Sequence, residues 1–268
     1  MNPRSFGIPS MKTLVFILIL ASIVSVGLFA RSNDKPNASA RTPVLVELFT
    51  SEGCSDCPPA DSFLGKLDQQ PVSTKELIVL SEHVDYWNHD GWTDPYSSHA
   101  FSERQDAYGQ HFQLASVYTP QMIVDGSTQF VGNNTKQAEK VLTAPPAGMQ
   151  VPIQITVVAL DGAVVRAHIE VATLPEHFRK SDVLFVVALN HAESQVARGE
   201  NAGRHLVHVA VVRSLSKVGT IDSKGTFSRD VSANLEKPVE KSDLRVIAFV
   251  QEPGPGRVLG SAMRRLTE

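Results

Sequence analysis

The feature that most constrains this chain is a pair of cysteines, Cys54 and Cys57, between an apolar run and an amphipathic segment. The run at residues 44–49 is mostly aliphatic and aromatic, which predicts a strand buried on both faces. After the pair, Pro58 and Pro59 open a segment with apolar residues at helical spacing. Proline is tolerated there because the first N–H groups of a helix have no intrahelical partner. A strand is therefore predicted to deliver two cysteines to a helix N-terminus.

This placement suits thiol–disulfide chemistry. Unpaired N–H groups and the positive end of the helix dipole stabilise a thiolate, and a two-residue spacer lets the second sulfur close a disulfide. A structural disulfide, or half of a metal site, remains an alternative, because a lone C-x-x-C is a weak signal. A structural zinc site needs four ligands, usually from two such pairs, whereas Cys54 and Cys57 are the only cysteines.

Composition limits the function classes. The 268 residues are 42% hydrophobic and 20% charged, with a net charge of −3, as in a soluble globular protein of one large or two ordinary domains. No basic excess indicates nucleic acid, so no such partner is expected. Two cysteines cannot form a disulfide scaffold, so the stability must come from a hydrophobic core.

The N-terminus indicates export. Arg4 and Lys12 precede residues 14–30, which carry no charge and are strongly apolar. This pattern predicts that residues 1–40 are a signal peptide and a polar linker, with an uncleaved membrane anchor as the alternative. Membrane contact is expected only through this segment. The folded part is expected to be periplasmic or secreted, where a disulfide persists.

The chain to residue 143 alternates strand and helix signals. An aromatic, polar loop at residues 83–95 follows the second strand, and ligands gather at the carboxyl ends of strands in open α/β sheets. Asp125-Gly126 indicates a hairpin turn. The predicted order is β-α-β-α-β-β-α, with the elements after the first helix at residues 77–80, 97–112, 122–124, 128–131 and 133–142.

The chain changes character after a proline- and alanine-rich break at residues 144–148. Seven strand candidates follow, separated by turn signals and without a long helix, which predicts a β-sandwich of immunoglobulin-like outline. Two domains are therefore expected, at residues 41–143 and 149–268. The strand candidates are residues 151–160, 164–171, 183–189, 205–215, 225–231, 244–251 and 258–266.

The first half resembles the thioredoxin fold, in its element order and its C-x-x-C. Five stretches in order, VELFTSEGCSDCPPAD, HVDYWNHDGWTDP, FSERQDAYGQ, VYTPQMIVDG and ARGENAGRHLVH, are similar to the domain of unknown function 1223 family, exported bacterial proteins with a thioredoxin-like domain. The resemblance covers the chain beyond residue 42. It implies an α/β thioredoxin-like domain and suggests redox activity, but no settled reaction.

Site roles follow from this arrangement. Cys54 is expected to face solvent and act as the nucleophile, and Cys57 to be the resolving thiol. The resemblance implies a cis-proline at Thr119-Pro120 that faces the disulfide and shapes a substrate groove, with loop packing as the alternative. Trp87 and Trp92 are expected to wall that groove, with core packing as the alternative.

Glu47 is a candidate because a thioredoxin has a buried acid, six residues before its first cysteine, that moves a proton to and from the resolving thiol. Here the separation is seven residues, which reverses the face unless the turn at Gly53 absorbs the difference. Otherwise Glu47 is expected to be an edge or loop-facing carboxylate. Asp56, beside the thiolate, is expected to make Cys54 less acidic than in strong oxidants.

Two further groups have open interpretations. Glu200, Asn201 and Arg204 belong to a stretch that either folds over the first half or is a plain solvated loop. Four residues of the aromatic loop could join the cysteines in a copper or zinc site, although a structural role is favoured and no metal is expected. These four are His83, Asp85, His89 and Asp90.

The expected function is that of an exported thiol-disulfide oxidoreductase that exchanges disulfides with envelope or periplasmic protein thiols and disulfides. No cofactor is expected, because the sequence has no glycine-rich phosphate loop and no Ser/His/Asp motif. The alternative is a non-enzymatic binding or metal-carrier module, in which the cysteines are a structural disulfide or metal ligands.

Overall fold

The computed structural model describes residues 1, 41–69, 74–89, 91–145 and 150–266. The predicted signal peptide and linker therefore lie outside the described residues, except for Met1. Residues 41–268 form one compact unit. Within the described residues, none of the helices has both the length and the apolar character needed to cross a membrane.

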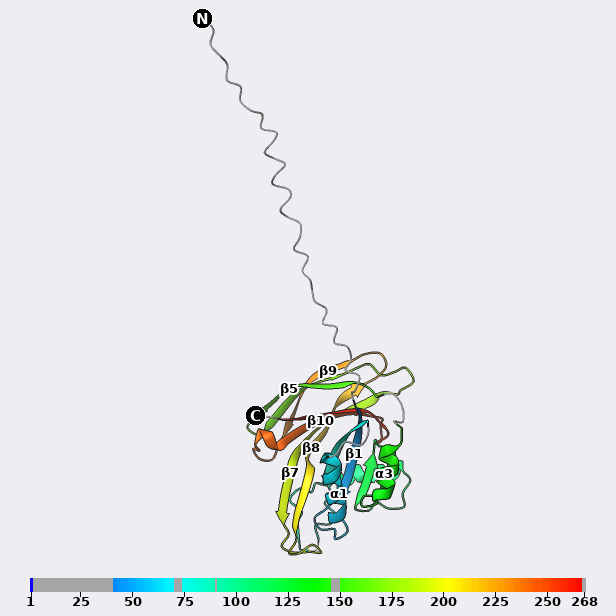
Figure 1. Cartoon of the computed structure of the whole chain (residues 1–268), viewed down its shortest axis with the longest axis vertical. Coiled ribbons are helices and arrows are strands. Elements are labelled where there is room, and N and C mark those ends of the chain that lie inside the picture. Colours follow the sequence, from blue (N-terminus) through cyan, green and yellow to red (C-terminus); the bar gives the residue numbers. More distant parts are fainter. Residues whose placement is uncertain (2–40, 70–73, 90, 146–149, 267–268) are drawn as a thin grey trace. The chain divides into compact units, whose positions relative to one another are not determined.

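The first half has the predicted element order. Strand β1 is parallel to β2 and antiparallel to β3, which pairs with β4. Figure 1 shows β1 with the helices α1 and α3 of this half. Residues 44–50 of β1 are all buried, which confirms the predicted burial on both faces. The elements are β1 (Thr42–Thr50), α1 (Pro58–Gln69), β2 (Lys75–His83), α2 (His99–His111), β3 (Gln121–Val124), β4 (Thr128–Val131) and α3 (Thr135–Thr143).

The second half contains all seven predicted strands. Three of them, β5, β6 and β9, form a separate antiparallel sheet, and the other four continue the sheet of the first half in the order β11-β10-β7-β8-β2-β1-β3-β4. A short 3₁₀ turn, Lys241–Asp243, precedes β10. The strands are β5 (Ile153–Asp161), β6 (Val164–Val171), β7 (Ser181–Gln195), β8 (His205–Ile221), β9 (Phe227–Asn234), β10 (Leu244–Gln251) and β11 (Val258–Arg265).

The eight-stranded sheet joins the two predicted domains, at residues 41–143 and 149–268. β8 pairs with β2 at Ser81 and Val211, so strands from both halves are hydrogen-bonded together. Moreover, side chains of β1 and β2, such as Leu45 and Ile78, share a core cluster with Ile247 of β10. A strand buried on both faces needs a cover on each face, and the second half supplies one of them.

The first half has a different cover on each face, as the period-two alternation of strand side chains requires. Val46 and Leu48 of β1 pack with Leu64 of α1 and Leu142 of α3. Leu45 points the other way, into the cluster that contains Phe101 of α2 and residues of β7 and β10. The two faces of β1 therefore have separate environments.

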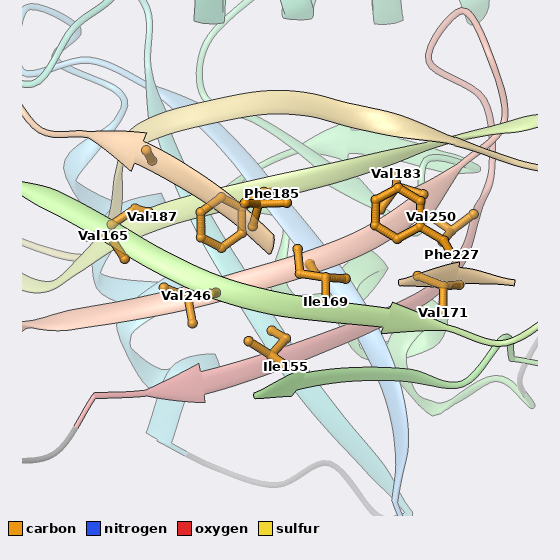
Figure 2. Close-up of a cluster of buried hydrophobic side chains, with 14 of the residues drawn as sticks. Ile155, Val165, Ile169, Val171, Val183, Phe185, Val187, Phe227, Val246 and Val250 are labelled. Atoms are coloured by element: carbon orange, nitrogen blue, oxygen red, sulfur yellow. The ribbon is translucent and has the colours of Figure 1, made fainter. Parts of the chain in front are cut away.

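The three-stranded sheet packs on the remaining face of β7 and β10. Figure 2 shows Ile155, Val165 and Ile169 from this sheet among Phe185 of β7 and Val246 of β10. Because β7 and β10 pack against β1 and β2 on their other face, their central residues are fully buried. Apolar surface buried in this way is worth about 25 cal/mol per Å², so this contact is a major source of stability.

A buried ion pair fixes the end of α1 to β10. The guanidinium of Arg245 is fully buried, and its two terminal nitrogens lie 2.6 and 2.9 Å from the two carboxylate oxygens of Asp68. Burial alone would raise the pKa of Asp68, but the bonds from Arg245 and Arg265 lower it below its usual value. The ion pair therefore fixes the C-terminal end of α1, whereas the cysteine pair lies at the N-terminal end of the same helix.

Candidate functional site

The site is built around a disulfide between Cys54 and Cys57 at the start of α1, directly after the carboxyl end of β1. The Cys57 carbonyl accepts the N–H groups of Ala60 at 2.9 Å and Asp61 at 3.1 Å, which begins the helix. The predicted strand, cysteine pair and helix therefore follow one another as expected.

Both cysteines are buried, with exposed fractions of 1% for Cys54 and 0% for Cys57. The expectation that Cys54 faces solvent is therefore wrong. The loop between β7 and β8, residues 196–204, is hydrogen-bonded to the turn that contains Cys54, and we call it the covering loop. Asn201 of this loop is fully buried, and its amide donates to the carbonyls of Glu52 at 2.8 Å and Cys54 at 2.9 Å.

A second contact of the covering loop lies at the exposed turn between the cysteines. The Glu200 carboxylate accepts the N–H of Ser55 at 2.9 Å. Hydrogen bonds from Ser55 lower the pKa of Glu200. Of the two interpretations of this stretch, the structure supports a loop that folds over the first half. Arg204 is exposed at the end of the loop, and Asp56 is also exposed.

The predicted groove residues Trp87 and Thr119 lie together beside this turn. The Trp87 indole N–H donates to the Thr119 hydroxyl at 2.8 Å. A Cβ atom on Gly53 would lie 2.9 Å from the Trp87 Cβ, so only glycine allows the tryptophan to pack this closely. Trp92 donates to the Glu52 carboxylate at 2.8 Å and therefore adjoins the same turn.

Pro120 lies beside the first turn of α1. The peptide bond between Thr119 and Pro120 is cis, as the resemblance implied. A Cβ atom on Gly132 would lie 3.1 Å from the Pro120 Cβ and 3.2 Å from the Ala60 Cβ, which locates the proline against the helix that carries Cys57.

Glu47 is not part of this group. It lies on the opposite face of β1 from α1, where Arg104 Nε is 2.8 Å from its carboxylate and the Tyr108 hydroxyl donates to it. The seven-residue separation from Cys54 is not absorbed by the turn, so the side chain faces α2. The predicted proton-transfer role is therefore corrected. The alternative of an edge carboxylate is also wrong, because Glu47 is fully buried.

Next to the disulfide, the structure reveals five buried ionisable residues that sequence reasoning did not assemble. We call Glu52, Asp61, His83, Asp94 and His208 the buried acid–base cluster; each is at most 6% exposed. Its members come from the β1–α1 turn, α1, the end of β2, the aromatic loop and β8.

Two histidines organise this cluster. His208 Nε2 lies 3.3 Å from Glu52 Oε1, and its Nδ1 lies 3.8 Å from Asp61 Oδ2. His83 Nδ1 lies 2.7 Å from Asp94 Oδ2. The two imidazole rings meet edge to face, with centroids 4.7 Å apart. The cluster is therefore continuous.

Oppositely charged groups in this cluster stabilise each other's charged forms. Burial alone would raise the pKa of Asp94, but His83 and the N–H groups of Glu52 and Tyr96 lower it to about 2. Burial alone would lower the pKa of His208, but the carboxylates of Asp61 and Glu52 raise it to about 10. His208 is therefore protonated at neutral pH, between two carboxylates.

The sequence held one signal for this cluster. Asp61 follows Cys57 by four positions, so the two side chains lie on the same face of the helix. Glu52, Asp94 and His208 become neighbours only through the tertiary fold. His83 pairs with Asp94, and within the described residues no group of three or more histidines, cysteines or carboxylates has the geometry of a metal site. Asp90 lies outside the described residues.

The sequence matches the model of one protein family over residues 45–251, which include the disulfide, the aromatic loop and the covering loop. The family's description is protein of unknown function, DUF1223. The chain belongs to the DUF1223 family. The comparison with curated proteins finds no match.

Two solved structures are similar to this DUF1223 chain. Protein AGR_C_4864 from Agrobacterium tumefaciens is 26% identical with a TM-score of 0.65, covering 85% of this chain and 96% of that one. HBP35 of Porphyromonas gingivalis is 16% identical with a TM-score of 0.61, covering 85% of this chain and 76% of that one. At this identity the second likeness concerns the fold alone.

Proposed function

We propose that this protein is an exported thiol-disulfide oxidoreductase that exchanges disulfides with protein thiols of the cell envelope through Cys54 and Cys57. The observation that carries the proposal is the disulfide at the N-terminus of α1, at the carboxyl end of the central strand β1. N–H groups and the helix dipole at this position favour the thiolate that exchange requires.

The fold supports the proposal. The sheet order β2-β1-β3-β4, with β1 parallel to β2 and β3 antiparallel to both neighbours, is that of a thioredoxin-like domain. Trp87, Thr119 and Pro120 surround the disulfide-bearing turn, as a groove for an extended substrate backbone would need. We infer that the second half is a sandwich of immunoglobulin-like outline fused to this domain.

The proposed reaction balances as a dithiol–disulfide exchange. A thiolate of the partner attacks Cys54 Sγ, forms a mixed disulfide and breaks the bond to Cys57, whose sulfur leaves with the electron pair and takes a proton. A second thiolate of the partner then attacks the partner sulfur that is bonded to Cys54 in the mixed disulfide, and Cys54 is released as a thiolate. The partner dithiol is oxidised to a disulfide, and Cys54 and Cys57 are reduced. The reverse sequence reduces a disulfide of the partner and re-forms the disulfide between Cys54 and Cys57.

Export supports the same assignment, because a disulfide persists outside the cytoplasm. The charged start and the apolar residues 14–30 carry this part of the proposal. The membrane is then a partner only if that segment is retained.

The second candidate is a non-enzymatic binding module in which the disulfide is a structural clip. The burial of both cysteines favours it, because no thiol can attack a sulfur beneath the covering loop without a movement of that loop. In the oxidoreductase, the loop opens during turnover; in the clip, the disulfide stays closed.

The experiment that separates these candidates uses single-cysteine variants and oxidised glutathione. In Cys57→Ser the remaining Cys54 thiol is expected to form a mixed disulfide with glutathione, detected by mass. In the matched control Cys54→Ser, Cys57 is expected to react much more slowly, because only Cys54 is the proposed point of attack. A Cys57→Ser protein that is folded but gains no glutathione would contradict the proposal and leave the structural clip.

A further inference from the structure

We propose that His208, held between Glu52 and Asp61, supplies the proton that Cys57 gains when the disulfide opens and recovers it when the disulfide closes. The inference rests on the proposed exchange function. It assigns the proton transfer to a different place from the one that sequence reasoning gave to Glu47.

The geometry places the two carboxylates on both sides of the cysteine pair. Glu52 precedes Cys54 by two residues, and Asp61 follows Cys57 by four, one helical turn along α1. The Asp61 N–H also donates to the Cys57 carbonyl at 3.1 Å. His208, from β8, lies 3.3 Å from the Glu52 carboxylate and 3.8 Å from the Asp61 carboxylate and therefore joins the two residues that flank the cysteine pair in the sequence.

Cys57 needs such a group because it is fully buried. A thiolate in these surroundings is unfavourable, since burial penalises the charged form and raises the pKa of a thiol above its usual value of about 8.5. Solvent does not reach the sulfur in the closed structure. The proton must therefore come from a neighbouring side chain.

The cluster has polar atoms available for this purpose. Neither carboxylate oxygen of Asp61 and neither ring nitrogen of His208 makes a hydrogen bond within the described part of the chain, although all four are buried. Buried polar atoms without hydrogen bonds are uncommon and call for an explanation. A group that exchanges protons with a neighbour and with water provides one.

A pocket joins the cluster to the surface. Its volume is about 420 Å³, and both Asp61 and His208 line it. The exposed side chains Ser62, Arg204 and His205 form its outer part. Water in this pocket can return a proton to His208 after each transfer without passing through the disulfide.

The step is a simple proton transfer within the exchange. The electron pair of the broken S–S bond goes to Cys57 Sγ, which gains a proton. In the proposal this proton leaves the His208 imidazolium and passes through Asp61, whose carboxylate lies 3.8 Å from His208 Nδ1 and one helical turn from Cys57, so that a neutral imidazole remains. The pocket then restores the proton. The two carboxylates raise the pKa of His208 to about 10, so the imidazole carries the proton at neutral pH that a general acid must supply.

Several elements contribute charged and titratable groups around His208. Glu52 and Asp61 hold its two nitrogens, and its ring meets the rings of His83 and Tyr96. Asp94 stands behind His83. The basic residues that line the mouth of the pocket are Arg204 and His205.

The test follows the rate of disulfide reduction by dithiothreitol from pH 6 to pH 11, an interval that includes the raised pKa of His208, in the wild-type chain and in His208→Gln, which has a polar side chain without a titratable proton. At neutral pH the variant is expected to react about 10²-fold more slowly, the lower end for general acid catalysis, with a changed pH profile. The matched control is His168→Gln, which removes a histidine paired with Asp230 at 2.7 Å on the distant three-stranded sheet. It is expected to keep the wild-type profile.

A His208→Gln protein with the wild-type rate and pH profile would overturn the inference and leave the exchange function intact. Failure of the wild-type disulfide to exchange at all would instead remove the proposed function. If His208→Gln does not fold, Asp61→Asn gives the same test. In the wild-type chain, the NMR titration of the His208 ring is expected to differ between the oxidised and reduced forms, and identical titrations would also refute the proton transfer.

Discussion

Replacing Asn201 by alanine is expected to speed the reduction of the Cys54–Cys57 disulfide. The amide of Asn201 donates to the carbonyls of Glu52 and Cys54, and the side chain is fully buried. These bonds hold the covering loop against the turn that contains Cys54, and we expect the loop to limit access to the sulfurs. In the alanine variant both bonds are lost, so the closed loop is destabilised relative to the open one.

The magnitude follows from the two bonds. Each hydrogen bond contributes about 0.5–1.5 kcal/mol net, so the closed state loses roughly 1–3 kcal/mol. Since about 1.4 kcal/mol corresponds to a tenfold change in an equilibrium, the open population rises roughly 5- to 150-fold. Reduction through the open state accelerates by the same factor while opening remains a fast pre-equilibrium.

The assay is the pseudo-first-order rate of reduction by dithiothreitol, measured by thiol alkylation and mass. The matched control is Gln195→Ala, because the exposed Gln195 amide makes only long bonds to the loop carbonyls of Gly203 and Arg204, at 3.3 and 3.4 Å. It is expected to react at the wild-type rate. An Asn201→Ala rate within twofold of wild type, or an equal acceleration in the control, would refute the reasoning.

Three further predictions concern stability. The raised pKa of His208 means that its charge stabilises the fold fully below about pH 6.5 and progressively less up to about pH 10. In urea unfolding, the difference in stability between wild type and His208→Gln should therefore shrink from about pH 6.5 to about pH 10. A difference that stays constant over this interval would contradict the prediction. Asp68→Asn leaves the buried Arg245 without its charge partner and should cost about 3–5 kcal/mol by the same method, with little loss counting against the ion pair. Gly132→Ala places a Cβ 2.7 Å from Leu48 Cδ1 and should cost about 1–3 kcal/mol; an unchanged melting temperature would argue against that packing.

The strands and helices could be predicted because their periodicity is local. The apolar run before Cys54 and the seven strand candidates after residue 150 all became strands, and the element predicted at residues 97–112 is α2, His99–His111. The eight-stranded sheet that joins the two halves could not be predicted, because the pairing of Ser81 with Val211 joins residues far apart in the sequence. Local patterns carry no information about such a partner.

The residues of the candidate site also fall into those that local motifs predict and those that only the tertiary fold brings together. Cys54, Cys57, Pro120 and the tryptophans were found because they belong to local motifs. Glu47 was misplaced because one residue in a strand reverses the face of a side chain. His208 was missed because it reaches Glu52 and Asp61 only where β8 passes beside α1.

The most direct test of the exchange function is the redox equilibrium of Cys54 and Cys57. The purified chain is equilibrated with glutathione buffers, alkylated and analysed by mass, with Cys54→Ser as the control that cannot form the disulfide. The account predicts a reversible potential between about −120 and −270 mV, the interval of exchanging oxidoreductases. A pair that stays oxidised below about −300 mV behaves as a structural disulfide and would contradict the account.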